Sequence, residues 1–410
     1  MIDIPKPIEL QNGLRVCVIP GVNLDSLTIH LRGLVGSNLE QGTEIGSAHL
    51  VEHLLVDNPQ KNKIKSFGGK IVGVTSRDDV LFMVKILKQD IADGLDFLSE
   101  ILKPRIFTKQ ELQTQKGIAI QEVKRSLSTP EKAITRLSRK IIYPNQRMAK
   151  LNTGSVEDIK RLNLKAVQDF HDRLYVPNNF VLVISGEVDE EIATKYADKF
   201  FGGFIKGKDT SAPKIIKDTR LKIQCINESS LTKAFVKVSY YSFPIKDERS
   251  YPALILSTLI NNYLENFIKS TLGLAYKVSC ENFPSGSYGL LSFYFSSEEK
   301  NVGDIIKHIN KISENIDNII SVRAVATVKT PIITSKIFDF EKVSLRADYY
   351  STLLLHGTKK QNHLYEIDSI KKIKAVEVRK LAYEILKQNP KITVMSRDLK
   401  EEDIKSYLQE

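Results

Sequence analysis

The sequence predicts an α+β protein with two homologous sandwich halves in tandem, each an antiparallel-rich sheet with helices packed on one face. The first observation is an internal match without gaps: residues 158–162 match 369–373, and residues 178–188 match 389–399, both at an offset of 369 − 158 = 211. The second is that the expected strands come in pairs and triples between helices, which favours α+β over strict βαβ alternation. A third is an aperiodic segment near the middle of the chain.

In the first half, strands are expected at residues 13–19 and 26–36, and a third strand at 79–87 leads into an amphipathic helix at 91–102. The same strand-and-helix pattern recurs at residues 290–312. In both copies an apolar strand precedes a polar or acidic helix start and then apolar residues at helical spacing. Recurrence of several elements in the same order indicates duplication.

The aperiodic segment is residues 206–217 (KGKDTSAPKIIK), whose Gly, Ser, Pro and Lys residues are typical of a linker. It divides the chain into a first half at residues 1–205 and a second half at residues 218–410. Each half is long enough, at about 200 residues, to bury a core of its own.

Charge and composition argue against several classes of protein. The 60 Lys and Arg residues exceed the 49 Asp and Glu residues by 11, but the densest basic stretches, residues 61–65 and 371–374, are short and lack interleaved aromatic residues. No nucleic-acid groove is therefore predicted. The apolar runs are far shorter than the ~20 residues of a membrane span. The pattern G-x-G-x-x-G is absent, and Asp209 stands where a Walker loop needs Ser or Thr.

The three cysteines, Cys17, Cys225 and Cys280, are an odd number without zinc or redox spacing. Residues 1–15 lack the basic start and apolar core of a signal peptide. We therefore expect a cytoplasmic protein with reduced cysteines, no nucleic-acid partner and no membrane association.

The sharpest chemical signal is His49-Leu50-Val51-Glu52-His53. Histidines four apart project from one face of a helix and can share one zinc ion, and Glu52 stands at the edge of that face, where it can act as a general base. This is the inverted zincin pattern H-x-x-E-H. With 7 His and 49 acidic residues in 410, the expected number of chance occurrences is about 0.014.

A catalytic zinc site needs a third protein ligand, and Glu122 is the candidate. Glu122 stands on a helix expected to open with the capping box Thr108-x-x-Glu111, and its helical neighbours are partly apolar. Gln115 lies on the same face. The alternatives are an ordinary surface carboxylate at Glu122 and Glu111 as the third ligand.

At these residues the sequence resembles the pitrilysin/insulinase family of inverted-motif zinc metallopeptidases, in particular its single-unit, processing-peptidase-like members. The resemblance runs the whole chain, and duplicated α+β halves are also what that family has. It rests on the motif and on four further segments: residues 10–16 (LQNGLRV), residues 36–49 with Gly36, Glu40 and Gly46, residues 68–78 with Gly68, Gly69, Thr75, Ser76 and Asp78, and residues 273–276 (GLAY).

The resemblance implies that His49, His53 and Glu122 ligate one Zn²⁺ per chain and that Glu52 activates the water that attacks a peptide carbonyl. Gln115 stands where many members carry a second acidic residue near the distal ligand, so it can hydrogen-bond to a ligand but supplies no negative charge.

In the second half, the resemblance implies that Tyr276 binds the substrate carbonyl together with the residue seven positions earlier. That residue is Lys269 instead of the family's arginine, which keeps the positive charge but loses the bidentate fork. At the strand expected to pair with substrate, Val72-Gly73 replaces the Asn-Ala of many members, so a side-chain anchor is missing.

Together these features predict a zinc-dependent metalloendopeptidase that hydrolyses short or unfolded peptides, in leader processing or in peptide clearance. Its first half would be catalytic, its second half would contribute carbonyl-binding residues, and a homodimer or a heterodimer with a related chain is implied. The alternative is a subunit or peptide-binding scaffold that needs a partner chain, because Lys269, Val72 and Gln115 all weaken substrate-side features.

Overall fold

The computed structural model describes residues 6–21, 24–357 and 362–409. The chain forms two compact units. Unit 1 consists of Met1–Lys124, Leu151–Pro213 and Lys336–Asn362; unit 2 consists of Arg125–Lys150, Lys214–Ser335 and His363–Glu410.

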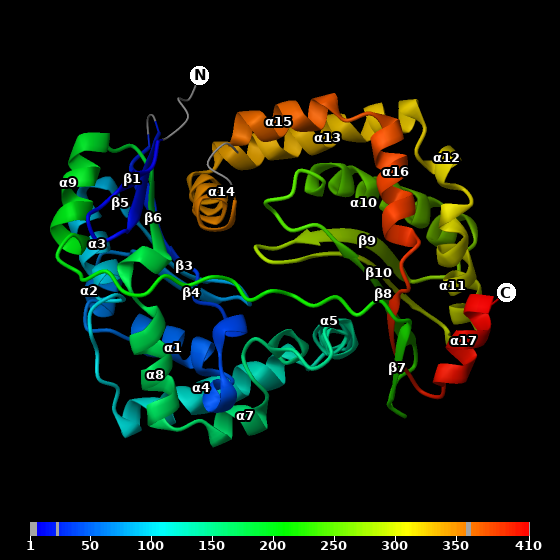
Figure 1. Cartoon of the computed structure of the whole chain (residues 1–410), viewed down its shortest axis with the longest axis horizontal. Coiled ribbons are helices and arrows are strands. Elements are labelled where there is room, and N and C mark those ends of the chain that lie inside the picture. The colour runs from blue at the N-terminus through cyan, green and yellow to red at the C-terminus, as the bar shows by residue number, and fades with distance from the viewer. Residues whose placement is uncertain (1–5, 22–23, 358–361, 410) are drawn as a thin grey trace. The chain divides into compact units, whose positions relative to one another are not determined.

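Unit 1 is built on a mixed six-stranded sheet of order β1-β2-β6-β3-β5-β4 (Figure 1). The neighbours β2 and β6 are parallel and the other pairs are antiparallel. The strands are β1 (Ile8–Glu9), β2 (Arg15–Pro20), β3 (Ser26–Gly33), β4 (Lys70–Thr75), β5 (Val80–Leu87) and β6 (Phe180–Gly186).

Unit 2 repeats this plan in a five-stranded sheet of order β7-β11-β8-β10-β9, in which only β7 and β11 are parallel. Its strands are β7 (Lys222–Asn227), β8 (Ala234–Ser242), β9 (Lys277–Pro284), β10 (Gly289–Ser297) and β11 (Lys391–Ser396). An offset of 211 places Phe82 of β5 on Phe293 of β10 and Val183 of β6 on Val394 of β11. The two sheets therefore confirm the duplication expected from the sequence.

The helices are assigned to the units as follows. Unit 1 contains α1 (Ser47–Val56), α2 (Lys61–Ser66), α3 (Ile91–Ser99), most of α4 (Lys109–Ser126), α7 (Val156–Arg161), α8 (Leu164–Leu174), α9 (Glu190–Phe201) and α14 (Val343–His356). Unit 2 contains α5 (Pro130–Leu137), α6 (Arg139–Ile142), α10 (Ser250–Leu264), α11 (Val302–Asn310), α12 (Ile316–Ile319), most of α13 (Val322–Glu341), α15 (His363–Lys372), α16 (Ala375–Leu386) and α17 (Glu401–Gln409), with a π-helical turn at Glu265–Thr271.

The α+β class and the two sheets with helices are confirmed, and one feature goes beyond the prediction: a helix also covers the second face of each sheet. In unit 1, Ala347 and Tyr350 of α14 pack on Cys17, Ile19 and Val183. This helix comes from the second half of the sequence. Its residues lie opposite α3 and α9 across the sheet (Figure 1).

In unit 2 the covering helix is α5, which comes from the first half of the sequence. Its Ala133 and Ile134 pack on Phe235 and Met395. The segment begins at Arg125 and the reciprocal segment at Lys336, again 336 − 125 = 211 residues apart. Each half of the sequence thus supplies one covering helix to the unit built mainly from the other half. Periodicity within one half of the sequence does not reveal this exchange of helices.

Residues 206–217 form neither helix nor strand, and the junction of the units at Pro213 and Lys214 lies within them. Each compact unit is made of three separate segments of the chain, so the units do not test the division of the sequence at residues 1–205 and 218–410. That division stays a prediction.

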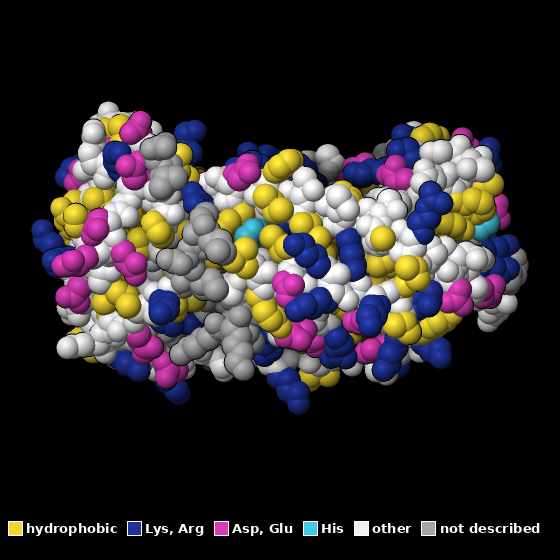
Figure 2. Space-filling view, turned by 90° about the horizontal axis from the view of Figure 1, so that it is seen from above, with side chains coloured by type: hydrophobic (Ala, Val, Ile, Leu, Met, Phe, Trp, Pro, Cys, Tyr) yellow, Lys and Arg dark blue, Asp and Glu magenta, His cyan; other side chains and the backbone are white. Residues whose placement is uncertain are grey.

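In the part of the chain that the structure describes, no helix combines the length and apolarity that a bilayer crossing requires. On the face in Figure 2, Lys and Arg side chains alternate with acidic and hydrophobic ones instead of forming one basic patch. This agrees with the scattered charge expected from the sequence.

Candidate metal centre and active site

Helix α1 is held at its N-terminus by a carboxylate from the preceding loop. The backbone N–H groups of Gly46 and Ala48 each donate to Glu40, at 3.0 Å. A negative charge at this end of a helix satisfies free donors and favours the helix dipole. Gly46 has φ +99°, which a glycine adopts readily. Further along the helix, the apolar side chains of α1 are buried, namely Leu50, Val51, Leu54 and Leu55. The helix is therefore held by Glu40 at its N-terminus and by core packing along its length.

The two histidines of the motif meet on one face of α1, as their spacing predicts. The Nε2 atoms of His49 and His53 lie 3.2 Å apart. His49 is buried, and His53 is partly buried. Two imidazole nitrogens this close offer two lone pairs to one cation.

Glu122 completes the group from α4. This helix opens with the predicted capping box: Glu111 N–H donates to Thr108 Oγ1 at 3.2 Å, and Thr108 N–H donates to Glu111 Oε2 at 2.8 Å. Glu122 Oε2 lies 3.3 Å from His49 Nε2 and 3.4 Å from His53 Nε2. Glu111 also pairs with Arg105 at 2.7 Å, so its carboxylate is engaged at the helix start instead of at the histidines.

The three donor atoms fit a tetrahedral zinc ion. With bonds of about 2.0–2.2 Å, tetrahedral ligand atoms lie about 3.3–3.6 Å from one another. The observed separations are 3.2, 3.3 and 3.4 Å. Among the described residues, His49, His53 and Glu122 are also the group of His, Cys, Asp and Glu side chains close enough to hold a metal ion.

Glu52 is buried on the same helix, and its carboxylate accepts a hydrogen bond from Thr75 instead of joining the three donor atoms. Thr75 Oγ1 donates to Glu52 Oε2 at 3.2 Å. Burial raises the pKa of the Glu52 carboxyl to about 7, against the lowering effect of the Thr75 bond and with a further rise from the charge of Glu122. A carboxyl with a pKa near neutrality suits a general base or acid.

The strand β4 provides the space that Glu52 occupies. A Cβ added to Gly73 would lie 2.1 Å from Glu52 Oε1, so a side chain at this position would displace the carboxylate. β4 is the terminal strand of its sheet, as a substrate-pairing strand must be, and Val72 and Val74 are exposed. Val72 and Gly73 therefore lie on an edge strand next to Glu52, although pairing with substrate stays a prediction.

Gln115 is buried next to His53. Its Oε1 lies 3.3 Å from His53 Nδ1, and its Nε2 donates to Asp57 Oδ2 at 3.4 Å. The contact with a motif histidine was expected, but Asp57 was not. Asp57 follows His53 by four residues, so helical spacing could have identified it.

Lys269 and Tyr276 both belong to unit 2. Lys269 lies in the π-helical turn, with its Nζ 3.7 Å from Glu265 Oε2. Tyr276 is half-exposed; its hydroxyl donates to Glu298 Oε1 at 3.5 Å, and Lys233 Nζ lies 4.1 Å from its ring centroid. Their role toward a substrate carbonyl stays a prediction.

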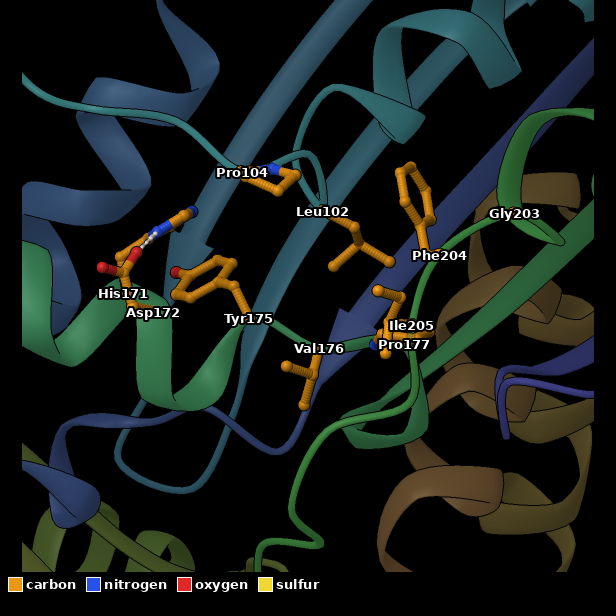
Figure 3. A pocket seen from close by; sticks show the side chains of 10 residues that line it. All are labelled: Leu102, Pro104, His171, Asp172, Tyr175, Val176, Pro177, Gly203, Phe204 and Ile205. Atoms are coloured by element: carbon orange, nitrogen blue, oxygen red, sulfur yellow. Dashed lines mark hydrogen bonds and ion pairs between the residues drawn. The ribbon is translucent and has the colours of Figure 1, made fainter.

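Unit 1 also contains a cavity of about 410 Å³ that includes none of the predicted site residues (Figure 3). Leu102, Phe204 and Ile205 give it an apolar wall, and the pair His171–Asp172, joined at 2.8 Å, lies at its other side. The titratable side chains that line it, His171, Asp172 and Tyr175, are not among the residues that the sequence predicts for the metal site.

Two family profiles match the chain. The profile described as Insulinase (Peptidase family M16) matches residues 25–153, and the profile described as Peptidase M16 inactive domain matches residues 161–331. The first covers the H-x-x-E-H segment and Glu122, and the second covers Lys269 and Tyr276.

Among curated proteins, the chain is similar to an uncharacterized zinc protease of Rickettsia felis, 22% identical over 83% of this chain and 85% of that protein. It is also similar to the mitochondrial-processing peptidase subunit beta of Saccharomyces cerevisiae, 26% identical over 47% of this chain and 44% of that protein. Among solved structures, a protease from Helicobacter pylori has the same fold, with a TM-score of 0.87, 17% identity, and coverage of 96% of this chain and 98% of that one.

Proposed function

The chain belongs to the insulinase family of peptidases, M16, and from this premise we propose that it is a zinc metalloendopeptidase that hydrolyses short or unfolded peptides. The observation that carries the proposal is the triangle of His49, His53 and Glu122 donor atoms with the buried Glu52 beside it. Relatives named zinc proteases support zinc as the metal.

In this proposal His49 and His53 bind one Zn²⁺ through Nε2, and Glu122 binds it through a carboxylate oxygen. When bound, zinc supplies Lewis acidity, which lowers the pKa of water and polarises a carbonyl. Because zinc needs neutral imidazoles with a free Nε2, each histidine must hold its proton at Nδ1.

Glu52 is the general base. It accepts a proton from the water that attacks the peptide carbonyl, and as a general acid it can return that proton to the leaving amine. The Thr75 hydroxyl, which donates to Glu52 Oε2, holds one carboxylate oxygen toward β4, while Oε1 lies over Gly73. A fixed orientation of this kind removes part of the entropic cost of reaching the transition state.

Substrate binds as an additional strand on β4. An edge strand offers unpaired N–H and C=O groups to an extended peptide, and the main-chain bonds give affinity without much sequence preference. Val72 and Gly73 bring no polar side chain to this contact, so recognition depends on the backbone. Extended, unfolded peptides satisfy this requirement, in leader or presequence processing or in peptide clearance.

The family resemblance supports a further role for Tyr276 and Lys269, which would stabilise the carbonyl oxygen as negative charge develops on it, Tyr276 by a hydrogen bond and Lys269 as a point charge. Unlike an arginine, Lys269 offers no planar fork, so we expect its contribution to be smaller.

The second candidate function is a subunit that needs a partner chain to cleave. It is favoured by Lys269, Val72 and Gln115, which weaken substrate-side features, and by the similarity to a yeast protein named as a subunit.

A homodimer or a heterodimer with a related chain, the absence of nucleic-acid and membrane partners, and a cytoplasmic location complete the proposal. The location rests on Cys17, Cys225 and Cys280, all of which are free.

The test is cleavage of a mixed pool of unfolded peptides by the purified, zinc-loaded chain, with Glu52→Gln as the matched control. Cuts made by the natural chain and lost in the control support a self-sufficient peptidase. A zinc-loaded chain that makes no cuts alone, but makes them after a related chain is added, supports the subunit. A chain that does not bind zinc contradicts both.

A further inference from the structure

Gln115 bridges the metal group and a carboxylate outside it. Its side chain is buried, with Oε1 3.3 Å from His53 Nδ1 and Nε2 3.4 Å from Asp57 Oδ2. These contacts use the two ends of one amide. The amide is therefore oriented and polarised by Asp57 at one end and contacts His53 at the other.

The chemistry of each atom fixes the direction of these bonds. If Nε2 of His53 is to bind a cation, the ring proton must reside on Nδ1, which then donates to an acceptor. Gln115 Oε1 is such an acceptor. Its NH₂ group can only donate, and the Asp57 carboxylate can only accept. The chain of donors from His53 through Gln115 to Asp57 is thus consistent at every step.

Asp57 is also positioned from its other side. Asp57 Oδ1 accepts from Lys61 Nζ at 2.9 Å, and the Asp57 backbone N–H donates to the His53 carbonyl at 3.1 Å where α1 ends. The side chain of Asp57 is 58% exposed. Its negative charge therefore stays largely in water, while the neutral Gln115 amide occupies the buried space beside His53.

We propose that Asp57 is a positioning residue that acts through Gln115: it polarises and orients the amide that holds His53 as the Nδ1–H tautomer for metal binding. The inference rests on the proposed function, because it presumes that His53 Nε2 binds zinc. It assigns to Asp57 and Gln115 together the contribution that a single buried carboxylate at position 115 would make directly.

The test is a double-mutant cycle read as zinc affinity, measured by competition with a chromogenic chelator on the full chain, without any activity assay. Asp57→Asn keeps an acceptor and removes the charge. Gln115→Met removes both amide contacts at similar volume. We expect Asp57→Asn to weaken zinc binding about tenfold, at the lower end of the 10–100-fold known for outer partners of metal ligands.

The effects of the two substitutions on zinc affinity must also be non-additive. In the Gln115→Met background, Asp57→Asn should cause no further loss, because the bridge is already broken. Gln115→Glu should restore tight binding and make it insensitive to Asp57→Asn. As a control, Asp93→Asn removes a charge that pairs with Lys63 at 2.6 Å, and it should leave zinc affinity unchanged.

Three results would overturn the inference. Zinc affinity unchanged in Asp57→Asn removes Asp57 from the site. Equal losses with and without Gln115 indicate a field effect of the charge through solvent, not a relay through the amide. A natural chain that does not bind zinc contradicts the proposed function itself, which distinguishes that failure from the first two. The melting temperatures of the metal-free variants would show whether a loss reflects unfolding.

Discussion

The pair α1–β4 in unit 1 and the pair α10–β9 in unit 2 occupy the same place in two copies of one topology. Gly73 of β4 pairs with Phe82, and Cys280 of β9 pairs with Phe293, its equivalent at an offset of 211. Gly73 leaves a space that Glu52 fills, whereas Cys280 fills its own space and is buried. One scaffold thus carries a carboxylate in the first copy and a packed side chain in the second.

The helices of the two pairs, α1 and α10, also differ in that the first carries polar groups of the candidate site and the second packs apolar side chains. α1 carries two histidines and Glu52, whereas α10 carries no histidine or glutamate and buries Ile255, Leu256 and Ile260. Asn261 of α10 is used to hold the strand, because its Oδ1 accepts from the Cys280 N–H at 3.0 Å. The comparison shows that the two copies differ in the polar side chains of one helix and in a missing side chain on one edge strand, while Glu122 of α4 completes the candidate metal group in the first copy.

The largest effect should come from Glu52→Gln, which removes the base and keeps the shape. We expect kcat/KM to fall by at least about 10³-fold, within the range that general acid–base catalysis supplies, while one zinc per chain is retained. Peptide hydrolysis and metal content, measured on the same sample, check this. Retained activity would remove Glu52 as the base.

Glu122→Ala should abolish tight zinc binding, since it removes one of three donors. The loss of affinity should exceed the 10–100-fold known for outer partners of a ligand. The matched control is Glu111→Ala, which removes the cap of the same helix and should lower stability by about 1 kcal/mol with little change in zinc affinity. The opposite pattern would make Glu111 the third ligand.

Gly73→Ala tests the comparison itself, because it adds a side chain to β4 at the position where β9 carries Cys280. The Cβ would collide with Glu52 Oε1, and a displaced base should lower kcat about 10²-fold without changing zinc content. The reciprocal change, Cys280→Ala, should leave kcat unchanged and reduce the free energy of unfolding by about 1 kcal/mol. Equal kinetics in Gly73→Ala and the natural chain would show that the close approach of β4 to Glu52 does not matter.

The smallest effect should come from Lys269→Arg, which restores a planar guanidinium. If Lys269 contacts the carbonyl oxygen, kcat should rise a few-fold, since a bidentate donor stabilises an oxyanion better than a point charge. Steady-state kinetics on a cleaved peptide measure it, with Lys405→Arg, at the exposed Lys405–Glu401 ion pair of α17, as the control for a lysine-to-arginine change elsewhere in unit 2. No change on any good substrate favours a packing role for this segment.

Much of the site could be predicted because its signals are local. The spacing of His49 and His53 requires only helical geometry, and the Thr108–Glu111 capping box placed the helix that carries Glu122. The duplication was visible because matching strands keep their apolar pattern at a constant offset.

The remainder depends on contacts between distant segments. The contact of Gly73 with Glu52 follows from how β4 lies beside α1, and no local pattern encodes it. The exchange of α14 and α5 between the units is invisible to periodicity for the same reason. Asp57 could have been found from its spacing, but its link to His53 depends on the rotamer of Gln115.

The central claim is that the first copy of the scaffold holds zinc through two histidines and a glutamate. X-ray absorption spectroscopy of the zinc-loaded chain measures this most directly. The account predicts one zinc per chain, a first shell of nitrogen and oxygen at about 2.0–2.2 Å, and a multiple-scattering signal for two imidazoles. Sulfur in the first shell, or an imidazole signal that survives in His49→Ala and His53→Ala together, would contradict it.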